Sequence, residues 1–341
     1  MHPSDSLSRR DFLRLGAAVF AGAWMPRSSA PLWQTAEPLQ GRVLASNLIV
    51  RDAPAFQGNR LSTLRRDTLV DILETVHGGV QGDTNRVWYR LGEGRFVTSS
   101  WVQTVRTELN PLQDAVPEQG CVGEITIPYA ESAWSIDPAM VWGYRLYFAS
   151  THWITGLRLS PVDGSPWYRA LDPSNRAAYY IRPEFVRLYP ADELAPLSPR
   201  VPPEQKRIEV HLRSQVLRAF EYGELVYTAR VSTGQANYET PTGLFRTFHK
   251  RPTYHMYGGA DASLVFDLPG VPWDTYITES GVAMHGTYWH NDFGTPHSHG
   301  CINMRPEDAR WIYRWTTPEV PPGEYLELAP GSGTQVLVAD P

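Results

Sequence analysis

The 341-residue sequence contains only two cysteines, Cys121 and Cys301, and it has little that would anchor it in a membrane. A membrane-spanning helix needs about 20 consecutive apolar residues. The apolar stretch from Leu15 to Trp24 is much shorter than this, and no long apolar segment follows it. We therefore expect a soluble mature protein without the dense disulfide framework of small secreted domains.

The sequence also lacks a positively charged stripe. Its formal net charge is −5, and residues 1–30 carry four arginines against two aspartates, so the remainder is more negative than the whole. Proteins that bind nucleic acid through bulk electrostatics usually present a basic face. We therefore expect no nucleic-acid partner.

Long runs of Ala, Leu, Glu and Lys are absent as well, whereas the chain has 12 Trp and 17 Tyr. Aromatic residues favour strands, so this composition predicts a mainly β fold. A chain of 341 residues exceeds one comfortable hydrophobic core. We therefore expect two or three domains.

The N-terminal segment resembles a twin-arginine export signal. The run Ser8-Arg9-Arg10-Asp11-Phe12 precedes the short apolar stretch, as it would before a signal h-region. Ala21-Gly22-Ala23 and Ser28-Ser29-Ala30 are both candidate cleavage sites, and a chance arginine pair before an amphipathic helix is the alternative. We expect residues 1–30 to direct export to the periplasm or cell-wall space, with membrane attachment only if the signal is not cleaved.

A proline-rich segment divides the rest of the chain. Residues 190–204 contain five prolines, which are Pro190, Pro196, Pro199, Pro202 and Pro203. Proline cannot donate a backbone hydrogen bond, and it stiffens the chain. The segment is therefore predicted to be a linker before a C-terminal domain at residues 205–340.

A weak internal repeat lies before this linker. Each copy predicts an aromatic strand, a turn, a second strand and a closing aromatic-valine pair. The copies lie at 87–91, 96–97 and 101–102, and at 166–170, 180–181 and 185–186. Residues 42–107 resemble a bacterial SH3-like barrel, a module often attached to wall enzymes, and residues 120–189 are predicted to form a second SH3-like or β-meander domain. Two generic β-meanders are the alternative.

The most informative motif is Ser298-His299-Gly300-Cys301-Ile302-Asn303, in which Cys301 lies sixteen residues after His285. A thiol attacks only as the thiolate, so a reactive cysteine needs a base or a cation nearby. His285 and His299 are the available bases. Gly300 allows close approach of the backbone, and the N–H groups of Gly300 and Cys301 are candidates to bind a developing oxyanion.

Two other interpretations of these residues are open. A lone cysteine is usually just a small buried apolar residue. Thiolate and imidazole are also the ligands that zinc prefers, and His290 and His297 lie close to the motif. No C-x-x-C pair and no H-E-x-x-H motif supports a metal site. We therefore predict none and interpret His290 and His297 as polar loop residues.

Together with His285-Gly286-Thr287, the motif is similar to the signature of the L,D-transpeptidase (YkuD-like) catalytic domain, in which a histidine precedes [S/T]-H-G-C-x-N. No motif position is substituted. The segments Ser232-Thr233-Gly234 and Thr240-Pro241-Thr242-Gly243 extend the resemblance over essentially all of residues 205–340. It implies a β-sandwich catalytic domain preceded by one or two SH3-like barrels, with residues 253–282 forming a flap over the substrate cleft.

The resemblance implies a cysteine acyl-transfer reaction. Cys301 would attack a peptidoglycan stem tetrapeptide and form a thioester, with His285 as general base and acid and the Gly286 carbonyl orienting its ring. The acyl group would pass to an amine of a second stem peptide, which gives a 3-3 cross-link. This exchange needs no cofactor, and a thiolate nucleophile also suits acylation by carbapenems.

Four neighbouring residues have predicted roles with alternatives. On a strand, His299 would share the face of Cys301, which makes it a second candidate base or a substrate-binding group. Asn303 shares that alternation and is predicted to orient His299 or the loop. Ser298 is either a hydrogen-bond donor or a turn residue. Arg305 is either a bidentate partner of a substrate carboxylate or a surface charge.

Two alternative functions are compatible with the same sequence. With water as the acceptor, the enzyme would be an L,D-carboxypeptidase. A non-catalytic wall-binding protein would keep only the fold, but the intact Cys301 and His285 argue against it. The SH3-like modules are expected to bind a wall ligand. A Cys121–Cys301 disulfide would block the nucleophile, so we expect both cysteines to be free.

Overall fold

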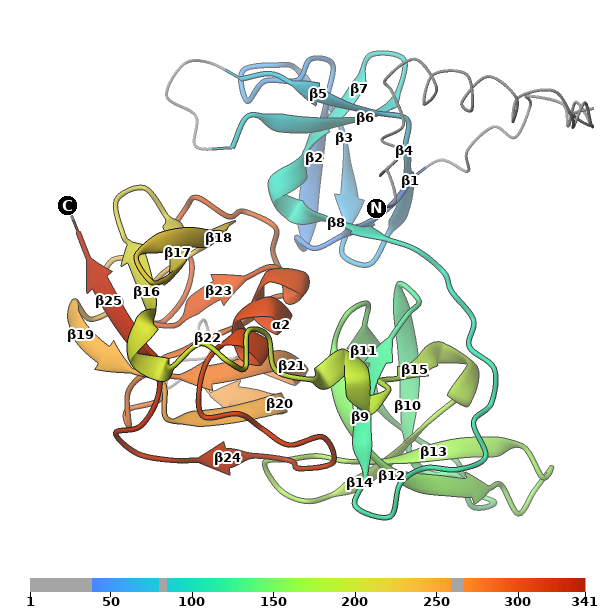
Figure 1. Ribbon diagram of the computed structural model, residues 1–341. Helices are drawn as coiled ribbons and strands as arrows, with labels where there is room; N and C mark the ends of the chain where they lie inside the picture. Colours follow the sequence, from blue (N-terminus) through green and yellow to red (C-terminus); the bar gives the residue numbers. More distant parts are fainter. Residues whose placement is uncertain (1–38, 80–84, 259–265, 341) are drawn as a thin grey trace, which may run out of the picture. The chain divides into compact units, whose positions relative to one another are not determined.

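The computed structural model describes residues 39–79, 85–258 and 266–340, so the predicted signal at residues 1–30 lies outside the described residues. Within these ranges the protein forms five β-sheets, and its one α-helix is α2 (Pro306–Trp315) (Figure 1). The prediction of a mainly β fold is confirmed. No helix in the described part of the chain is long and apolar enough to span a membrane.

The first module consists of two sheets. Its elements are β1 (Leu39–Val43), β2 (Asn47–Arg51), β3 (Arg60–Arg65), β4 (Leu69–Ile72), β5 (Glu74–His77), β6 (Val87–Gly92), β7 (Arg95–Thr98), the 3-10 helix η1 (Ser99–Trp101) and β8 (Val102–Val105). One sheet has the order β4-β1-β8 and the other β3-β2-β7-β6-β5. Val43, Val50 and Val97 are completely buried between them, so the module has a hydrophobic core of its own.

The second module is built on one seven-stranded sheet with the order β11-β10-β14-β13-β12-β9-β15. Its elements are β9 (Cys121–Ile125), β10 (Tyr129–Ser135), β11 (Val141–Tyr147), β12 (Thr151–Leu159), β13 (Pro166–Leu171), β14 (Ala178–Ile181), the 3-10 helix η2 (Pro183–Phe185) and β15 (Val186–Leu188). Ile125, Ile154 and Tyr168 are completely buried in its core. This module therefore also has its own apolar centre.

The internal repeat is found at corresponding places in the two modules. β6 pairs antiparallel with β7, and β13 pairs antiparallel with β14. In each module a 3-10 helix then leads directly into the last strand, β8 or β15. The copies therefore share a strand, turn, strand, 3-10 helix and strand. The SH3-like assignment of both modules stays a prediction.

The proline-rich segment packs along the C-terminal domain. It includes the 3-10 helix η3 (Ala191–Leu194) and runs into η4 (Pro203–Gln205). Leu197 packs against the core of that domain, and the Arg314 side chain donates to the Ala195 carbonyl at 2.9 Å. The prolines therefore interrupt regular structure, while neighbouring residues fix the path of the segment.

The C-terminal domain contains two five-stranded sheets and α2. Its strands are β16 (Lys206–His211), β17 (Val216–Glu221), β18 (Glu224–Arg230), β19 (Gly243–Arg246), β20 (His249–Gly258), β21 (Phe266–Tyr276), β22 (Ala283–Gly286), β23 (Ile302–Met304), β24 (Glu327–Leu328) and β25 (Gln335–Ala339). The sheet orders are β18-β17-β16-β25-β19 and β23-β22-β21-β20-β24. In the second sheet β22 and β23 are parallel neighbours, and the motif residues lie on or beside this pair.

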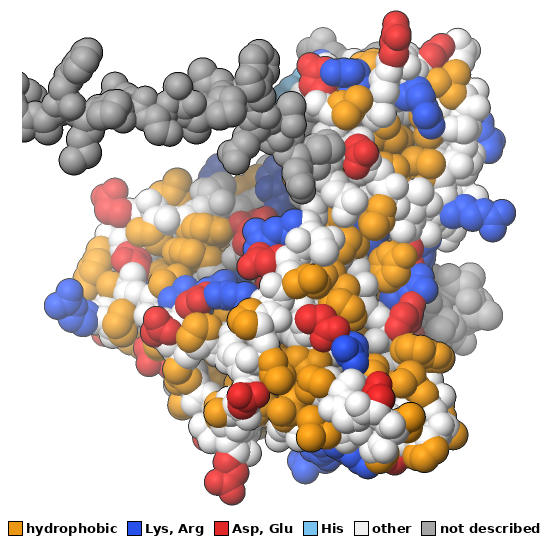
Figure 2. All heavy atoms as spheres, turned by 90° about the vertical axis from the view of Figure 1, so that its right-hand side faces the viewer, with side chains coloured by type: hydrophobic (Ala, Val, Ile, Leu, Met, Phe, Trp, Pro, Cys, Tyr) orange, Lys and Arg blue, Asp and Glu red, His pale blue; other side chains and the backbone are white. Residues whose placement is uncertain are grey.

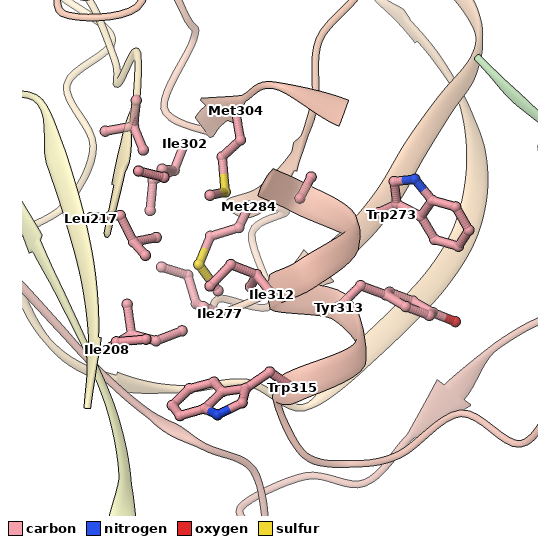
Figure 3. Packing of buried hydrophobic residues seen from close by; sticks show 14 of the residues in the cluster. Ile208, Leu217, Trp273, Ile277, Met284, Ile302, Met304, Ile312, Tyr313 and Trp315 are labelled. Atoms are coloured by element: carbon pink, nitrogen blue, oxygen red, sulfur yellow. The ribbon is translucent and has the colours of Figure 1, made fainter. Parts of the chain in front are cut away.

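The two sheets and α2 share one hydrophobic core (Figure 3). Ile208 and Leu217 come from the first sheet, Met284 and Ile302 from the second, and Ile312 from α2. Each of these side chains has no exposed surface. Full burial of such a side chain contributes about 1.5–3 kcal/mol relative to exposure. Every second residue of β22 and β23 therefore packs into the core. The residues that alternate with these lie on the opposite face of the sheet.

Charged side chains of both signs are interspersed on the face of the molecule drawn in Figure 2. Lys and Arg lie among Asp and Glu on this face and form no continuous stripe. The fields of closely spaced opposite charges largely cancel, and salt at 0.1 M screens exposed charges beyond about 10 Å. This face therefore does not present the single-sign field that attracts a polyanion.

Candidate active site

The motif residues lie at the adjacent parallel strands β22 and β23. Their register pairs Met284 with Ile302 and His285 with Asn303. Because Met284 and Ile302 point into the core, His285 and Asn303 point to the opposite face of the sheet. Cys301 directly precedes β23, at the end of the bend at residues 299–301, and the N–H of Ala283 on β22 reaches its sulfur. Cys301 is one strand and two residues from His285, so their Cα atoms lie about 8 Å apart, within the combined reach of an imidazole and a thiol.

Cys301 is a free and partly exposed thiol, and the other cysteine, Cys121, is free in the core of the second module. The Cys301 Sγ donates to the carbonyl of Gly281 at 3.7 Å. Burial raises the pKa of the Cys301 thiol to about 11, although the N–H of Ala283 acts to lower it. The resting nucleophile is therefore a thiol, and a base must remove its proton for attack.

His285 has the properties of that base. Only 1% of its surface is exposed, and its Nδ1 lies 3.0 Å from the carbonyl oxygen of Gly286. A carbonyl only accepts hydrogen bonds, so Nδ1 carries the proton and Nε2 keeps its lone pair. Burial lowers the pKa of His285 to about 4, so the ring is uncharged at neutral pH. The site therefore pairs a neutral thiol with a neutral imidazole in a fixed tautomer.

Ser298 holds the loop before Cys301. Its hydroxyl donates to the Cys301 carbonyl at 2.5 Å and accepts the N–H of Gly300 at 3.1 Å. Gly300 has φ +116°, a conformation that other residues rarely adopt. The Gly300 N–H, predicted to face an oxyanion, is therefore bonded to Ser298 in this structure. The N–H of Cys301, in contrast, has no hydrogen-bond partner among the residues that the structure describes.

The segment Ser232-Thr233-Gly234 supports this loop from the neighbouring sheet. The Thr233 carbonyl accepts the N–H groups of His297 at 3.0 Å and Ser298 at 3.1 Å. Ser232 and Asn303 form an antiparallel bridge with hydrogen bonds of 2.9 Å in both directions. The backbone of this segment therefore fixes both ends of the motif loop.

Thr240 is a positioning residue that the sequence alone did not identify. Its hydroxyl donates to the Gly300 carbonyl at 2.8 Å and accepts the N–H of Gly234 at 2.9 Å. A Cβ at Gly234 would lie 2.0 Å from the carbonyl oxygen of Tyr238, so only glycine fits there. The T-P-x-G pattern predicts a turn at this place, and the turn explains the proline but not the contact with the nucleophile loop.

His299 does not lie on a strand. Residues 299–301 form a bend, because the positive φ of Gly300 turns the chain. The exposed ring of His299 packs edge-on against Tyr238, with centroids 4.5 Å apart, and its centroid is 6.1 Å from that of Phe266. The prediction that His299 shares a strand face with the nucleophile is wrong. Its exposed place between two aromatic rings suits substrate contact better than proton transfer.

Asn303 bonds to His290 and not to His299. Its side-chain amide lies 2.9 Å from His290 Nε2, and both residues are at most 3% exposed. His290 Nδ1 accepts the N–H of Asp292 at 3.3 Å, and burial lowers the pKa of His290 to about 3, so the neutral ring carries its proton on Nε2. In the structure the Asn303 Nδ2 faces this nitrogen and its Oδ1 has no partner, so turning the amide over lets the oxygen accept that proton. Of the two predicted roles of Asn303, the structure therefore shows a contact with the loop, through His290, and none with His299.

Arg305 lies at the other end of β23 from Cys301. Four residues along a strand span about 13 Å. The exposed guanidinium lies 5.6 Å from the ring centroid of Phe293 and borders a cavity of 440 Å³ that neither His285 nor Cys301 lines. The structure therefore does not bring Arg305 to the reacting centre, and its predicted contact with a substrate carboxylate would lie away from the thiol.

His297 belongs to a hydrogen-bonded group that connects the motif loop to the first module. Its Nε2 lies 2.7 Å from Asp292 Oδ2, and Asp292 Oδ1 accepts the hydroxyl of Ser100 at 2.7 Å. Across the described ranges, no group of three or more His, Cys, Asp or Glu side chains is arranged to hold a metal ion. The loop histidines therefore take part in protein hydrogen bonds.

A tyrosine without a motif signal shares the face of His285. Tyr276 on β21 pairs with Ala283 on β22 and with His249 on β20. Ala283 follows the alternation of His285, so the side chains of Tyr276 and His249 point to the same face. Only the two-residue periodicity of the strand could have indicated this from the sequence.

Comparison with known proteins agrees with the motif. Residues 205–338 match the family model of the L,D-transpeptidase catalytic domain. L,D-transpeptidase 1 of Mycobacterium tuberculosis is 32% identical over 102 residues, which cover 27% of this chain and 39% of that protein. The putative L,D-transpeptidase YkuD of Bacillus licheniformis is 29% identical over 106 residues, which cover 30% of this chain and 55% of that protein. The chain thus spans less than two thirds of the length of either relative.

Solved structures of L,D-transpeptidases are also similar to part of the chain. An L,D-transpeptidase from Mycobacterium smegmatis is 21% identical with a TM-score of 0.33, covering 54% of this chain and 82% of that chain. An L,D-transpeptidase of Enterococcus faecium is 24% identical with a TM-score of 0.32, covering 40% of this chain and 50% of that chain. The assignment of the C-terminal domain rests on the family match at residues 205–338.

Proposed function

We propose that this protein is an exported peptidoglycan L,D-transpeptidase. The observation that supports it best is the pair formed by Cys301 and His285 on one face of the sheet, with the ring tautomer fixed by Gly286. This pair lies in the domain that matches the L,D-transpeptidase family. A neutral thiol beside a neutral base is the starting state for acyl transfer through a thioester.

The proposed reaction moves one proton within this pair. His285 Nε2 takes the thiol proton while the Cys301 Sγ attacks the peptide carbonyl of a stem tetrapeptide. The carbon–nitrogen bond then breaks, the leaving D-Ala amine takes the proton from His285, and a thioester remains. An acceptor amine reverses these steps and gives a 3-3 cross-link. Because the pair begins and ends neutral, no net charge has to be buried in the site.

Acylation of the thiol tests this proposal directly. The purified chain and a Cys301→Ala variant are each incubated with a carbapenem and examined by intact-mass spectrometry. We expect one adduct on the wild type and none on the variant. A reduced, folded wild type without an adduct would contradict the proposal and favour the non-catalytic wall-binding alternative.

The acceptor is tested with stem-peptide substrates. Incubation with and without an amine acceptor separates transfer from hydrolysis, because only transfer gives a product that contains both peptides. We expect the cross-linked product when an amine is present. Release of D-Ala at the same rate in both reactions, with no joined product, would identify an L,D-carboxypeptidase.

Export through the twin-arginine route is part of the proposal. It is supported by the sequence of residues 8–14 and the short apolar stretch that follows. Replacing Arg9 and Arg10 together by lysine should leave the protein in the cytoplasmic fraction, whereas the wild type should reach the periplasm or the cell-wall space. Equal distribution of the two proteins would contradict this route.

For the two N-terminal modules we propose that they bind the cell wall. The second module has an open apolar groove of 370 Å³ whose lining includes Trp142 and Trp167, and Trp142 is 60% exposed. Exposed apolar surface of this kind often marks an interaction site. Trp142→Ala should reduce co-sedimentation with insoluble peptidoglycan and leave carbapenem acylation of Cys301 unchanged.

A further inference from the structure

The loop around Cys301 provides few donors for the charge that acyl transfer creates. Attack on a carbonyl places negative charge on its oxygen, and preorganised hydrogen-bond donors aimed at that oxygen stabilise the transition state. The N–H of Gly300 is bonded to the Ser298 hydroxyl at 3.1 Å, so it is not available. The N–H of Cys301 has no hydrogen-bond partner among the described residues, so it is a backbone donor available at the nucleophile. A side chain on the same face can supply a second donor.

Tyr276 is the side-chain donor in register with the nucleophile. It pairs with Ala283, whose N–H points to the Cys301 sulfur. Tyr276, Ala283 and Cys301 therefore form one row across β21, β22 and the start of β23. Two inter-strand steps of about 4.8 Å separate the outer Cα atoms, and the length of a tyrosine side chain spans much of that gap.

The ring of Tyr276 is held in place by two neighbours. His249 stacks on it, with centroids 4.8 Å apart and an interplanar angle of 20°. The guanidinium carbon of Arg251 lies 5.6 Å from the centroid of the same ring. A ring fixed in this way can aim its hydroxyl without losing further side-chain entropy when the substrate binds.

The hydroxyl of Tyr276 is open and protonated. The residue is partly exposed, and its oxygen has no hydrogen-bond partner and is not enclosed among the described residues. Burial of the ring raises the pKa of Tyr276, and the nearby carboxyl of Asp274 acts in the same direction. The hydroxyl therefore remains a donor throughout the neutral and moderately alkaline range.

We propose that the Tyr276 hydroxyl donates a hydrogen bond to the oxyanion formed when Cys301 attacks the acyl donor. This inference rests on the proposed function and adds a catalytic residue to it. As the sulfur–carbon bond forms, the carbonyl π pair moves to oxygen, and the Tyr276 O–H and the Cys301 N–H point to that oxygen. When the carbonyl re-forms, the carbon–nitrogen bond breaks and the nitrogen takes its proton from His285. Tyr276 keeps its proton throughout.

Two reactions of the same thiol test this role. Acylation by a carbapenem passes through an oxyanion, whereas alkylation by iodoacetamide does not, and both begin with the Cys301 sulfur. Tyr276→Phe removes only the hydroxyl. We expect the rate of acylation to fall by about 10²- to 10³-fold, as for loss of one oxyanion donor, and the rate of alkylation to stay within about twofold.

Tyr254→Phe is the matched control. Tyr254 lies on β20 with its ring 4.5 Å from the Arg251 guanidinium carbon, so the control removes a tyrosine hydroxyl from the same hairpin. Both rates should stay near those of the wild type. Thermal unfolding of all three proteins, followed by circular dichroism, shows whether each is folded at the assay temperature.

Three other outcomes overturn the inference. Unchanged acylation of Tyr276→Phe means that its hydroxyl does not meet the oxyanion. An equal fall in acylation and alkylation means that Tyr276 only maintains the site around the thiol. A wild type that is alkylated but not acylated fails the proposed function as well, and this result is distinct because it already appears without any substitution.

Discussion

His285 and His255 are both buried histidines of the same sheet, 1% and 6% exposed, but their partners differ completely. His285 donates from Nδ1 to a backbone carbonyl and keeps a lone pair on Nε2. His255 has Nδ1 at 2.5 Å from Asp172 Oδ2 and Nε2 at 2.5 Å from Asp267 Oδ1. One ring can accept a proton, and the other has both nitrogens committed as donors. The comparison shows that the partners, more than burial, decide what a histidine does.

The pKa values of the two rings follow from these partners. Burial lowers the pKa of His285 to about 4, and the Gly286 carbonyl opposes this only in part. Burial also acts to lower the pKa of His255, but the hydrogen bonds to Asp172 and Asp267 outweigh it, so its pKa is raised. His285 is therefore a neutral base, and His255 is a cation that bridges the β20–β21 hairpin to the second module.

The largest difference is expected between the acylation rates of the variants in which each histidine is replaced by glutamine. Glutamine cannot take the thiol proton, so His285→Gln should lower the rate of carbapenem acylation by at least about 10³-fold. His255→Gln should leave that rate within a few fold, because His255 does not face the thiol. Stopped-flow measurement of adduct formation checks both. Full activity in the His285 variant would refute its assignment as the base.

His299→Ala completes this series. The exposed His299 ring packs on Tyr238 and lies in a bend, so its loss should leave part of the acylation rate. A loss as complete as that of His285→Gln would return His299 to the role of base. The order of the three rates therefore tests the site assignment as a whole.

The sequence could predict the neutral histidine but not the charged one. His285 and Cys301 belong to two short motif segments, sixteen residues apart, with family-like spacing. His255 gave no signal, because Asp172 lies 83 residues away along the chain and only the tertiary fold brings the two together. Contacts of this kind depend on register and on packing between domains, which local patterns do not encode.

The same limit explains the errors near the nucleophile. His299 was predicted to lie on a strand, but Gly300 has a positive φ and β23 begins only at Ile302, one residue after Cys301. Asn303 has the predicted alternation but bonds to His290, which lies on a loop rather than a strand. One residue with a positive φ is enough to turn the side chain before it away from the face of the strand that follows.

Loss of either carboxylate that contacts His255 should lower the free energy of unfolding, but by different amounts. The Asp172 side chain is 1% exposed and that of Asp267 is 64% exposed. Removing the buried charge leaves a buried imidazolium without its main partner, so Asp172→Asn should lower the free energy of unfolding by about 3 kcal/mol. Asp267→Asn should lower it by less than about 1 kcal/mol, because water screens an exposed partner. Urea unfolding measures both, and equal losses would contradict the bridge geometry.

The two histidines should give stability opposite dependences on pH. His285 has a folded pKa of about 4, below the unfolded value of about 6.5, so the unfolded chain binds more protons between these values. Wild type should therefore lose about 2 kcal/mol through His285 between pH 7 and pH 5, and His285→Gln should not. His255 has a raised folded pKa, so its contribution is complete below about pH 6.5 and is lost as the pH rises through the folded value.

Denaturant unfolding at several pH values checks these signs. The difference in stability between wild type and His255→Gln should shrink on the alkaline side, whereas the difference between wild type and His285→Gln should change on the acid side. Parallel pH curves for the two variants would show that the rings have similar surroundings. That result would remove the basis of the comparison.

The smallest effect is expected from a charge that touches neither histidine. Arg305 lies about 13 Å along β23 from Cys301, and its guanidinium is exposed. Two unit charges at that distance in water interact by only about 0.3 kcal/mol, and physiological salt screens charges beyond about 8 Å. Arg305→Gln should therefore change carbapenem acylation by less than about twofold. A larger loss that is insensitive to added salt would mean that Arg305 contacts a carboxylate of the acyl donor. Only such a direct contact would let this distant charge act on the neutral pair of Cys301 and His285.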